Sequence, residues 1–559
     1  MDDDFEIVKN KVLKGVNGES ERQYDRITVD VVRKAVNLLK PKKSDAGFDI
    51  SSDFYLNGPT ELIHHLTNLL KLFFSHGYVP QVVLICTLIP LLKDNLGDIT
   101  TSSNYRAIAG GCLLLKLIDL VIIVLEGDKL DYDTMQFAYQ TKSSTTMCSW
   151  SVAAVIEHFN NKGTNVFSAS MDMSKAFDMV EWRELFTVLM DRKVDSLFLR
   201  LLLFIYTNQQ CNVKWCGRYS NSFTVQNGVR QGAVTSGIFF AVYIDKLLKI
   251  LRKSGLGCRI HGVFFGALIF ADDIILLSGS RNGLQAMVDI CYQFASSRNL
   301  KFGTNTDPRK SKTKCVLFNQ RKINTNEVAP IKLGGNVLPW VQDVKHLGHV
   351  LQADNSMKLD ISQKRGAFVG RVNSLLQEFH SVKQDVMIKL IKSFACSVYG
   401  SNLWDLFSHE CERLYTSYNV AIRNALDIDR CAHRYLVEPL SETLHLKIMI
   451  LSRYVTFYKS LKESKKFPVR FLARLNENDR ETVLGRNLAN IALLCNVRNT
   501  FELNPKMVKD TVKYRTIPDK ERWRVNFAWE LLKVREEDVA VNGFDEDELE
   551  TLLTYICKM

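Results

Sequence analysis

The sequence contains no CxxC pair, although it has thirteen cysteines. An odd number of scattered cysteines is not the pattern of a disulfide framework, and without closely spaced pairs it offers no zinc knuckle. Free thiols are typical of a reducing compartment. We therefore expect an intracellular protein, located in the nucleus, the cytoplasm or both.

Export and membrane signals are also missing. The chain begins MDDDFE, which has neither the basic start nor the apolar core of a signal peptide. The longest apolar run, Val82–Leu92, has eleven residues between Gln81 and Lys93, whereas a bilayer-spanning helix needs about 20. No membrane partner is expected.

Charge is unevenly distributed along the chain. The chain of 559 residues carries a net charge of +12, yet residues 536–559 hold eight acidic side chains and one lysine. Residues 1–535 are therefore more basic than the chain as a whole. A basic body suits a polyanionic partner such as nucleic acid, although many basic proteins bind none.

One stretch, Phe264–Ser278, reads FFGALIFADDIILLS and places Asp272 and Asp273 between two apolar runs. Strand-length runs separated by turn-tolerant residues predict a buried β-hairpin with carboxylates at its tip. Aspartate is also common in ordinary turns, so the pair alone does not decide between a turn and a functional site.

A further carboxylate, Asp172, ends the segment FSASMDMSKAF, in which apolar and polar residues alternate. Alternation with a period of two predicts a strand with Asp172 on its polar face. Two strands that each end in a carboxylate can lie side by side and share divalent cations. This is the minimum requirement for two-metal phosphoryl transfer.

These motifs occur in an order that resembles the reverse transcriptases of the non-LTR (LINE-type) retrotransposons. The resemblance covers roughly residues 38–460. Its motifs, in chain order, are NYRAI at 104–108, QFAYQTKSSTT at 136–146, DMSKAFD around Asp172, GVRQG at 228–232 and FADD at 270–273.

The resemblance implies an α+β right-hand polymerase fold with fingers, a palm built on an antiparallel sheet and a helical thumb. We expect a polar N-terminal arm at 1–30, fingers at 31–165, a palm at 166–355 and a helical thumb at 356–535. A primer-grip hairpin at 344–351 would close the palm, and 536–559 would form an acidic tail.

The implied activity is RNA-directed DNA synthesis onto a primer 3′ end. The partners are an RNA template, a DNA primer and deoxynucleoside triphosphates, and the cofactors are two Mg²⁺ ions, for which Mn²⁺ can substitute. Asp172 and Asp272 would hold the ions, with Asp273 as a second-tier catalytic and metal ligand, because neighbouring strand residues point in opposite directions. Nothing in the spacing itself distinguishes an RNA from a DNA template.

Further site residues follow from the same resemblance. Lys93 and Arg106 would grip the triphosphate, Gln231 and Gly232 would contact the nucleotide, and Lys312 would protonate the leaving pyrophosphate. Each cation could equally be a surface charge. Phe177 would lie beneath the sugar and exclude a 2′-hydroxyl, although a core role for this side chain is the alternative.

The chain departs from the family pattern at three positions. Ala107 replaces a proline, Gln140 replaces an arginine, and Gly237 replaces a proline. These departures keep a rival hypothesis open, namely an inactive relic that binds nucleic acid as a scaffold. The segments before Asp172 leave no room for an endonuclease, and no ribonuclease H pattern follows the thumb, so a polymerase core cut from a larger element is expected.

Basic and aromatic residues also interleave between Arg453 and Lys466. Such a face could follow the backbone of a duplex. Lysine stems lying over an apolar stripe would give the same pattern.

Overall fold

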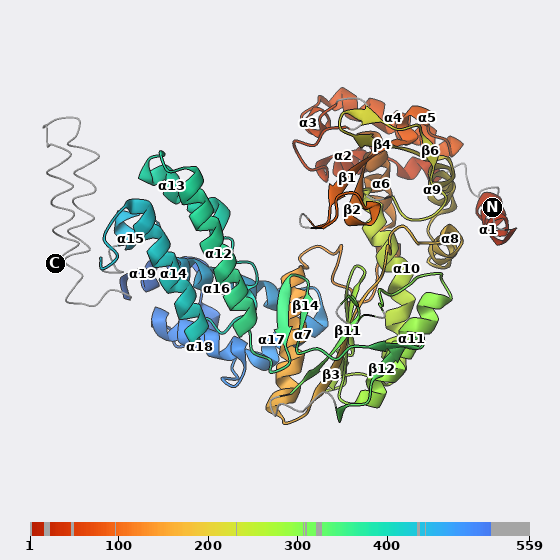
Figure 1. Cartoon of the computed structure of the whole chain (residues 1–559). Helices are drawn as coiled ribbons and strands as arrows, with labels where there is room; N and C mark the ends of the chain where they lie inside the picture. Colours follow the sequence, from red (N-terminus) through yellow and green to blue (C-terminus); the bar gives the residue numbers. More distant parts are fainter. Residues whose placement is uncertain are drawn as a thin grey trace, which may run out of the picture.

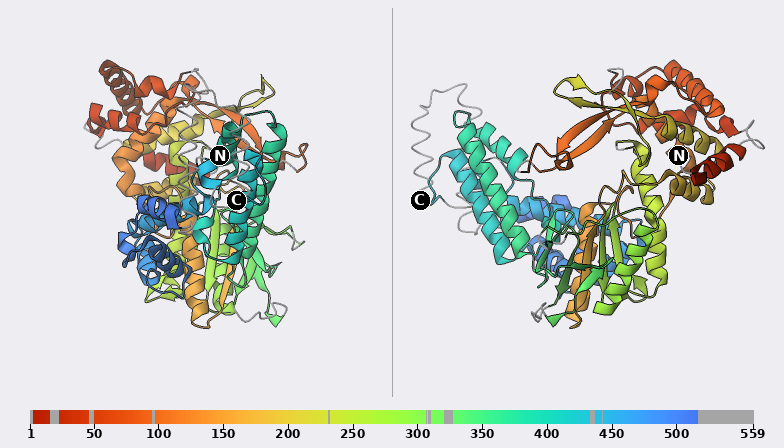
Figure 2. Two further views of the ribbon diagram at one scale, coloured as in Figure 1. Left: turned by 90° about the vertical axis from the view of Figure 1, so that its left-hand side faces the viewer. Right: turned by 45° about the vertical axis from the view of Figure 1, so that its right-hand side comes forward.

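A computed structural model describes residues 3–15, 23–45, 50–94, 97–230, 232–305, 307, 310–319, 327–432, 437–441 and 443–515. The acidic tail and Gln231 lie outside these residues. The ribbon has the outline of a U, with the N-terminal helices and one sheet on one arm and the C-terminal helices on the other (Figures 1 and 2). A second sheet lies at the base between them.

The sheet at the base has four antiparallel strands in the order β11-β3-β10-β9. Its strands are β3 (Val166–Asp172), β9 (Ala267–Phe270), β10 (Asp273–Ser278) and β11 (Lys314–Phe318). Both predicted elements, the hairpin around FADD and the strand ending at Asp172, are present. Helices α7 (Thr145–Asn161) and α11 (Arg281–Ser296) pack against this sheet.

A five-stranded sheet occupies the N-terminal arm. Its strands are β1 (Ile85–Leu92), β2 (Tyr105–Gly110), β4 (Gln210–Trp215), β5 (Arg218–Tyr219) and β6 (Phe223–Thr224). Because β1 pairs in parallel with β4, the sheet joins residues on both sides of the expected boundary at 165/166. The boundary at 165/166 therefore does not separate one sheet from the other. Local sequence patterns could not predict this pairing, because β1 and β4 lie far apart along the chain.

Pro90 lies inside a strand, a position that proline seldom occupies. β1 runs through Pro90, which pairs only with Ala107 of β2. The last residue of β1 that pairs with β4 is Leu88, so the strand needs no N–H at Pro90 on that side. A proline is tolerated where the ladder leaves one edge open.

The first described residues of the N-terminal arm form a packed helix. Residues Asp3–Lys14 form helix α1, which buries Phe5, Val8 and Val12 and packs against α8 (Trp182–Asp191) and α9 (Ser196–Asn208). The spacing of these apolar residues is helical, but it is hidden in a strongly polar segment.

The remaining helices of this half are α2 (Val29–Asn37), α3 (Ser52–Leu56), α4 (Thr60–His76), α5 (Gln81–Leu84), α6 (Leu113–Glu126) and α10 (Val234–Lys253).

Helix α8 begins later than its sequence suggests. Serine is a common N-cap residue, yet no helix follows Ser174 directly, and α8 starts at Trp182, after Glu181. The chain turns instead, with Lys175 at a φ of 52°, and the Ser174 N–H donates to the carbonyl of Lys301. This turn carries Phe177 back towards the end of β3.

Three short hairpins complete the strands: β7 (Arg259–Ile260) with β8 (Val263–Phe264), β12 (Ile331–Leu333) with β13 (Asn336–Leu338), and β14 (Asp343–His346) with β15 (His349–Gln352). The last of these is the hairpin expected at 344–351, and its turn contains Gly348 at a φ of 84°.

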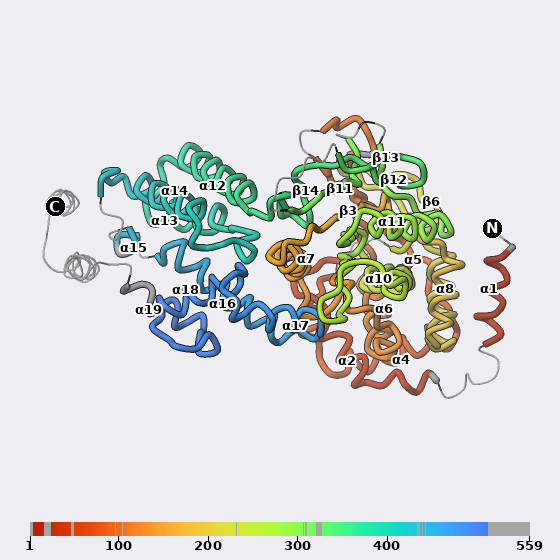
Figure 3. Tube along the Cα trace, turned by 90° about the horizontal axis from the view of Figure 1, so that it is seen from below, coloured from red at the N-terminus to blue at the C-terminus, as the bar shows by residue number. Residues whose placement is uncertain are grey.

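The C-terminal half is helical, as its periodicity predicts, and it forms the second arm (Figures 2 and 3). Its helices are α12 (Lys358–Glu378), α13 (Gln384–Leu390), α14 (His409–Leu426), α15 (Val437–Leu440), α16 (Leu446–Lys462), α17 (Phe467–Asn476), α18 (Val483–Cys495) and α19 (Pro505–Arg515). Within the described part of the chain, none combines the length and apolarity needed to cross a bilayer.

The basic and aromatic residues of α16 do not form one exposed face. Tyr454, Phe457 and Tyr458 are buried. Lys462 pairs with Glu477, with 3.1 Å between Nζ and Oε2. Lys466 is only 3% exposed, so the predicted duplex-tracking face is reduced to scattered cations because its aromatic members pack inward.

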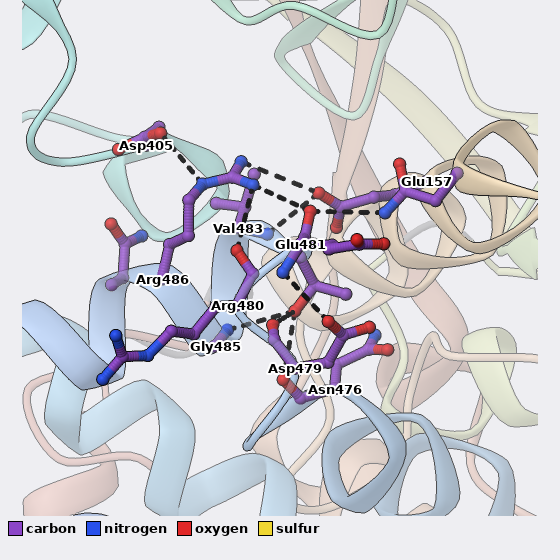
Figure 4. Close-up of polar contacts among 12 residues, drawn as sticks. Glu157, Asp405, Asn476, Asp479, Arg480, Glu481, Val483, Gly485 and Arg486 are labelled. Atoms are coloured by element: carbon purple, nitrogen blue, oxygen red, sulfur yellow. Dashed lines mark hydrogen bonds and ion pairs between the residues drawn. The ribbon is translucent and has the colours of Figure 1, made fainter.

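A polar cluster joins the C-terminal helices to α7 (Figure 4). Glu157 of α7 accepts a hydrogen bond of 2.9 Å from the Val483 N–H at the start of α18. Nη2 of Arg486 lies 3.9 Å from Glu157 Oε1, and Nε of the same arginine lies 3.4 Å from Asp405 Oδ2. These contacts connect segments more than 300 residues apart along the chain.

Candidate active site

Three carboxylates meet where β3 ends and β10 begins. Asp273 lies directly opposite Asp172 in the antiparallel register, so their side chains project from the same face. Asp272 belongs to the turn between β9 and β10, where Ala271 has a φ of 57°. Because a turn separates them, the strand rule that ranked Asp273 below Asp272 does not apply here.

The carboxylates repel one another electrostatically. Burial, followed by the negative charges of Asp272 and Asp172, raises the pKa of Asp273 to about 6, while Lys312 opposes the shift. Burial also raises the pKa of Asp272, Asp172 adds to the rise, and Arg106 and Lys312 oppose it. Like charges at this range favour protonation or a bound cation.

Lys312 reaches this cluster, as the resemblance implies. Its Nζ lies 3.1 Å from Oδ2 of Asp172. The lysine stem passes over Gly303, where a Cβ atom would lie 3.2 Å from Lys312 Cβ and Cδ. The Gly303 N–H donates to the Asp172 carbonyl at 2.9 Å, so the same short segment holds both partners of the ion pair.

The QFAYQ motif positions the carboxylate turn, a role that the sequence did not reveal. Buried Gln136 uses its Oε1 to accept hydrogen bonds from the N–H groups of Ala138 and Ala271 at 3.1 and 3.0 Å. Ala271 directly precedes Asp272. The only indication of this role in the sequence was a glutamine in a motif otherwise rich in buried apolar residues.

The predicted triphosphate cations lie on the β1–β2 hairpin. Arg106 pairs with Leu91 across this hairpin and is close enough to Asp272 for its charge to lower that pKa. Lys93 lies just past the end of β1 and is exposed, and its N–H donates to the carbonyl of Asn104. Because Arg106 pairs with Leu91, two residues before Lys93, both predicted cations lie near the turn end of this hairpin.

Gly228 and Gly232 permit close backbone approach, but the approaching backbone belongs to this chain. A Cβ at Gly232 would lie 2.3 Å from the carbonyl oxygen of Ala109, and one at Gly228 would lie 2.9 Å from that of Phe177. Both glycines have positive φ angles, of 89° at Gly228 and 97° at Gly232. Their expected approach to a template or nucleotide is therefore not the contact that requires glycine here.

A buried ion pair anchors the same loop. Nη2 of Arg230 lies 2.5 Å from Oδ1 of Asp119, whose Oδ2 accepts the Val234 N–H at the start of α10. The signal for this pair was a lone carboxylate in the apolar helix α6. Breaking such a pair leaves an uncompensated buried charge.

Phe177 is partly buried and packs on the core. Its ring stacks on Phe240 with centroids 4.8 Å apart and an interplanar angle of 16°. Its carbonyl accepts the Val229 N–H at 2.9 Å, which ties it to the GVRQG loop. The ring therefore has the packing of a core residue, while its loop leads directly from Asp172.

The carboxylates suit a cation shared with a substrate. Among the described residues, no group of three or more His, Cys, Asp or Glu side chains is arranged to hold a metal ion by itself. Asp172 Oδ2 is nevertheless a buried oxygen with no hydrogen bond of normal geometry from any described residue. Mg²⁺ is usually bound by one or two carboxylates together with substrate phosphates, which fits this set.

Residues 93–351 match the family model described as reverse transcriptase (RNA-dependent DNA polymerase). The chain contains a reverse transcriptase domain. This domain spans β2, the three carboxylates, Lys312 and the β14–β15 hairpin, and it begins at Lys93. With the mixed helices and sheets, it confirms the expected α+β polymerase class.

Relatives of this chain include retrotransposon proteins. The chain is 25% identical over 339 residues to the Pol polyprotein of the type-1 retrotransposable element R2 of Nasonia vitripennis, covering 60% of this chain and 31% of that protein. It is 24% identical over 422 residues to the corresponding R1 protein of Bradysia coprophila, covering 70% and 40%. The chain thus spans less than half of either relative. These matches support the LINE-type assignment.

Among solved structures, a telomerase from Candida albicans in complex with a fragment of telomeric RNA matches with a TM-score of 0.34 and 12% identity, over 80% of this chain and 69% of that one.

At two of the three positions where the chain departs from the family pattern, the residue present makes contacts within the structure. Lys466 donates hydrogen bonds to Gln140 Oε1 and to the carbonyls of Thr134 and Gln136, so Gln140 fixes a C-terminal lysine. Gly237 accommodates the ring of Tyr139. The reverse transcriptase domain has thus adjusted around these positions.

Proposed function

We propose that the chain is an RNA-directed DNA polymerase of a non-LTR retrotransposon, which adds deoxynucleotides to a primer 3′ end. The supporting observation is the meeting of Asp172, Asp272 and Asp273 at one sheet edge beside Lys312. Two Mg²⁺ ions bound there would stabilise the attacking 3′-oxygen and the leaving pyrophosphate oxygen. Mn²⁺ would serve in their place.

In this proposal each protein group has one task. Asp172 and Asp273, which lie opposite each other, hold cations, and Asp272 joins them from the turn. Arg106, together with Lys93, binds the triphosphate, where fixed positive charge matters most. Lys312 releases Asp172 when a cation arrives and delivers a proton to the departing pyrophosphate.

The structural regions take the corresponding roles. The five-stranded sheet with its helices serves as the fingers, the four-stranded sheet as the palm, and α12–α19 as the thumb. The β14–β15 hairpin serves as the primer grip, and Gly232 contacts the nucleotide together with Gln231, which lies outside the described residues. The RNA template and DNA primer are proposed from the retrotransposon relatives and from the basic charge of the chain.

Primer extension on poly-RNA and matched DNA templates, with Mg²⁺ or Mn²⁺, tests the proposal. We expect extension on RNA by the wild type and a loss of at least 10²-fold in Asp172→Asn, because a lost metal ligand should cost at least as much as a lost electrostatic group. Asp385→Asn is the matched control, since Asp385 is exposed on α13 and pairs only with Lys389 among the described contacts.

Duplex binding provides the second readout. Asp172→Asn should bind primer–template as tightly as the wild type, and affinity should fall steeply with salt as counterions are released. Extension by Asp172→Asn within tenfold of the wild type would contradict the metal assignment. A folded wild type that binds duplex but extends nothing would instead indicate the scaffold.

A further inference from the structure

Tyr139 occupies a strained turn at the edge of the proposed nucleotide site. Its φ is 58°, in the left-handed region that bulky residues rarely adopt. The turn is held firmly, because the Tyr132 hydroxyl donates to the Ala138 carbonyl at 2.7 Å and Gln136 accepts the Ala138 N–H at 3.1 Å. Strain that the surrounding contacts maintain in this way clusters at functional sites.

One edge of the Tyr139 ring rests on Gly237 in the first turn of α10. A Cβ at position 237 would lie 2.3 Å from both Cδ1 and Cε1 of the ring. Neither the expected proline nor any other side chain fits there unless the ring moves. Gly237, a departure from the family pattern, and Tyr139 are therefore in contact with each other.

The Tyr139 ring also meets Phe177 edge-on. The centroids of the Tyr139 and Phe177 rings are 6.3 Å apart, and the rings make an interplanar angle of 72°. Phe177 also stacks on the ring of Phe240. Phe240 is completely buried, whereas Tyr139 is 49% exposed. Phe177 thus has a fixed neighbour in the core and an accessible neighbour on the substrate side.

We propose that Tyr139, seated on Gly237, is a positioning residue that sets the Phe177 ring for sugar discrimination. This inference rests on the proposed function. A ring excludes a 2′-hydroxyl by clash only where it is held in place, so its selectivity depends on whatever prevents it from sliding. Phe240 supports the Phe177 ring from the core. The Tyr139 ring fills the space on the exposed side of Phe177 and so prevents the Phe177 ring from moving there.

The ring of Tyr139, rather than its hydroxyl, carries this role. Partial burial and the charge of Asp272 raise the pKa of the hydroxyl to about 12, so it stays neutral at ordinary assay pH. Tyr139→Phe keeps the ring on Gly237 and against Phe177. It is the conservative variant that should preserve selectivity.

The experiment measures kcat/KM for dATP and for ATP in single-nucleotide extension. In Tyr139→Ala and in Gly237→Ala we expect the dATP/ATP ratio to fall roughly three- to tenfold, the size of one aromatic contact. Tyr139→Phe should stay within twofold of the wild type. The double variant Tyr139→Ala/Gly237→Ala should match Tyr139→Ala alone, because the new Cβ has no ring left to displace.

A second comparison shows whether Tyr139 acts through Phe177. In a Phe177→Val background, adding Tyr139→Ala should leave the ratio unchanged, and this comparison remains available if Gly237→Ala fails to fold. An unchanged ratio in folded Tyr139→Ala, with a wild type that extends and prefers dATP, overturns this inference alone. A wild type that does not extend overturns the proposed function and this inference with it.

Discussion

Asp273 and Glu157 are both partly buried carboxylates with a raised pKa, and they differ in what surrounds them. Asp273 has a pKa of about 6, and the charges that add to its burial come from Asp272 and Asp172. Glu157 has a pKa of about 7, raised by burial, but the Val483 N–H and Arg486 both counter the shift (Figure 4).

Under the proposed function, the difference separates a functional from a structural carboxylate. At the sheet edge, Lys312 and Arg106 offset only part of the repulsion among the three carboxylates, so the site still favours a bound cation or a proton. At the junction, the Val483 N–H and Arg486 offset part of the cost of burying Glu157, and the cluster connects α7 to α18. The comparison can be broken by removing one group from each place.

The largest effect is expected for Asp273→Asn. Synthesis should fall about 10²–10³-fold, because a group that stabilises developing charge is lost. The melting temperature should not fall: a folded pKa raised above 3.8 means that ionisation destabilises the fold as pH rises through about 6, and Asn removes that cost. Extension assays and thermal melts at pH 7.5 check both parts.

Glu157→Gln is the matched variant for that comparison, and its synthesis should stay within about threefold of the wild type. A Glu157→Gln variant that is as inactive as Asp273→Asn would remove the distinction between the two places.

The next effect concerns pH and Glu157. Because its folded pKa is about 7 and its ordinary value 4.5, the stability that its protonated form contributes is present below pH 4.5 and lost as pH rises through 7. The free energy of unfolding of Glu157→Gln, relative to that of the wild type, should therefore increase from pH 5 to pH 8, by up to about 3 kcal/mol.

Denaturant titrations at several pH values measure this gain. The charged groups around Glu157 are Arg486, Asp405 and Asp479. A difference between variant and wild type that is constant with pH would show that Glu157 is ionised throughout this range.

Arg486→Ala should lower the free energy of unfolding, and this effect should be somewhat smaller than the pH effect at Glu157. The Arg486 guanidinium donates to the Glu481 carbonyl at 2.7 Å and faces Glu157 and Asp405. Because Glu157 is the one largely buried partner, leaving it without the arginine should cost about 1 kcal/mol, the low end for a buried polar group without a partner. Urea unfolding should show this loss, while kcat/KM of the remaining folded enzyme should be unchanged; a selective loss of activity would place the cluster in the catalytic machinery.

The smallest effect is expected for Gly303→Ala. The added Cβ would lie 3.2 Å from the Lys312 stem and 3.3 Å from Ser174 Oγ, so Lys312 must shift by a few tenths of an ångström. Extension should slow by less than about tenfold, because a displaced general acid is less costly than a lost metal ligand. Gly279→Ala is the control, since nothing lies within 4 Å of its Cβ; equal rates in both variants would argue against Lys312.

Local patterns were sufficient for the elements that carry the carboxylates. Alternation around Asp172 and the paired apolar runs around Asp273 predict β3, β9 and β10, because side-chain periodicity directly reflects burial on a sheet. The hairpin at 344–351 was expected from the resemblance to the family, and the helical C-terminal half from the spacing of its apolar residues.

The failures share a different cause. The parallel pairing of β1 with β4, the clamp of Gln136 on Ala271 and the buried position of Lys466 all depend on partners more than 100 residues away. The rank of Asp273 was missed because one residue of turn changes which carboxylate faces Asp172. Local sequence cannot specify such contacts, although it can supply the residues that make them.

The most direct test is Mn²⁺ binding, followed by electron paramagnetic resonance in the presence of primer–template and a deoxynucleotide that cannot be incorporated. The account predicts that wild type and Glu157→Gln bind about two more Mn²⁺ ions per chain than the nucleotide does alone, and that Asp172→Asn loses this binding. Equal Mn²⁺ binding by Asp172→Asn and the wild type would contradict the assignment of the sheet-edge carboxylates as the metal site.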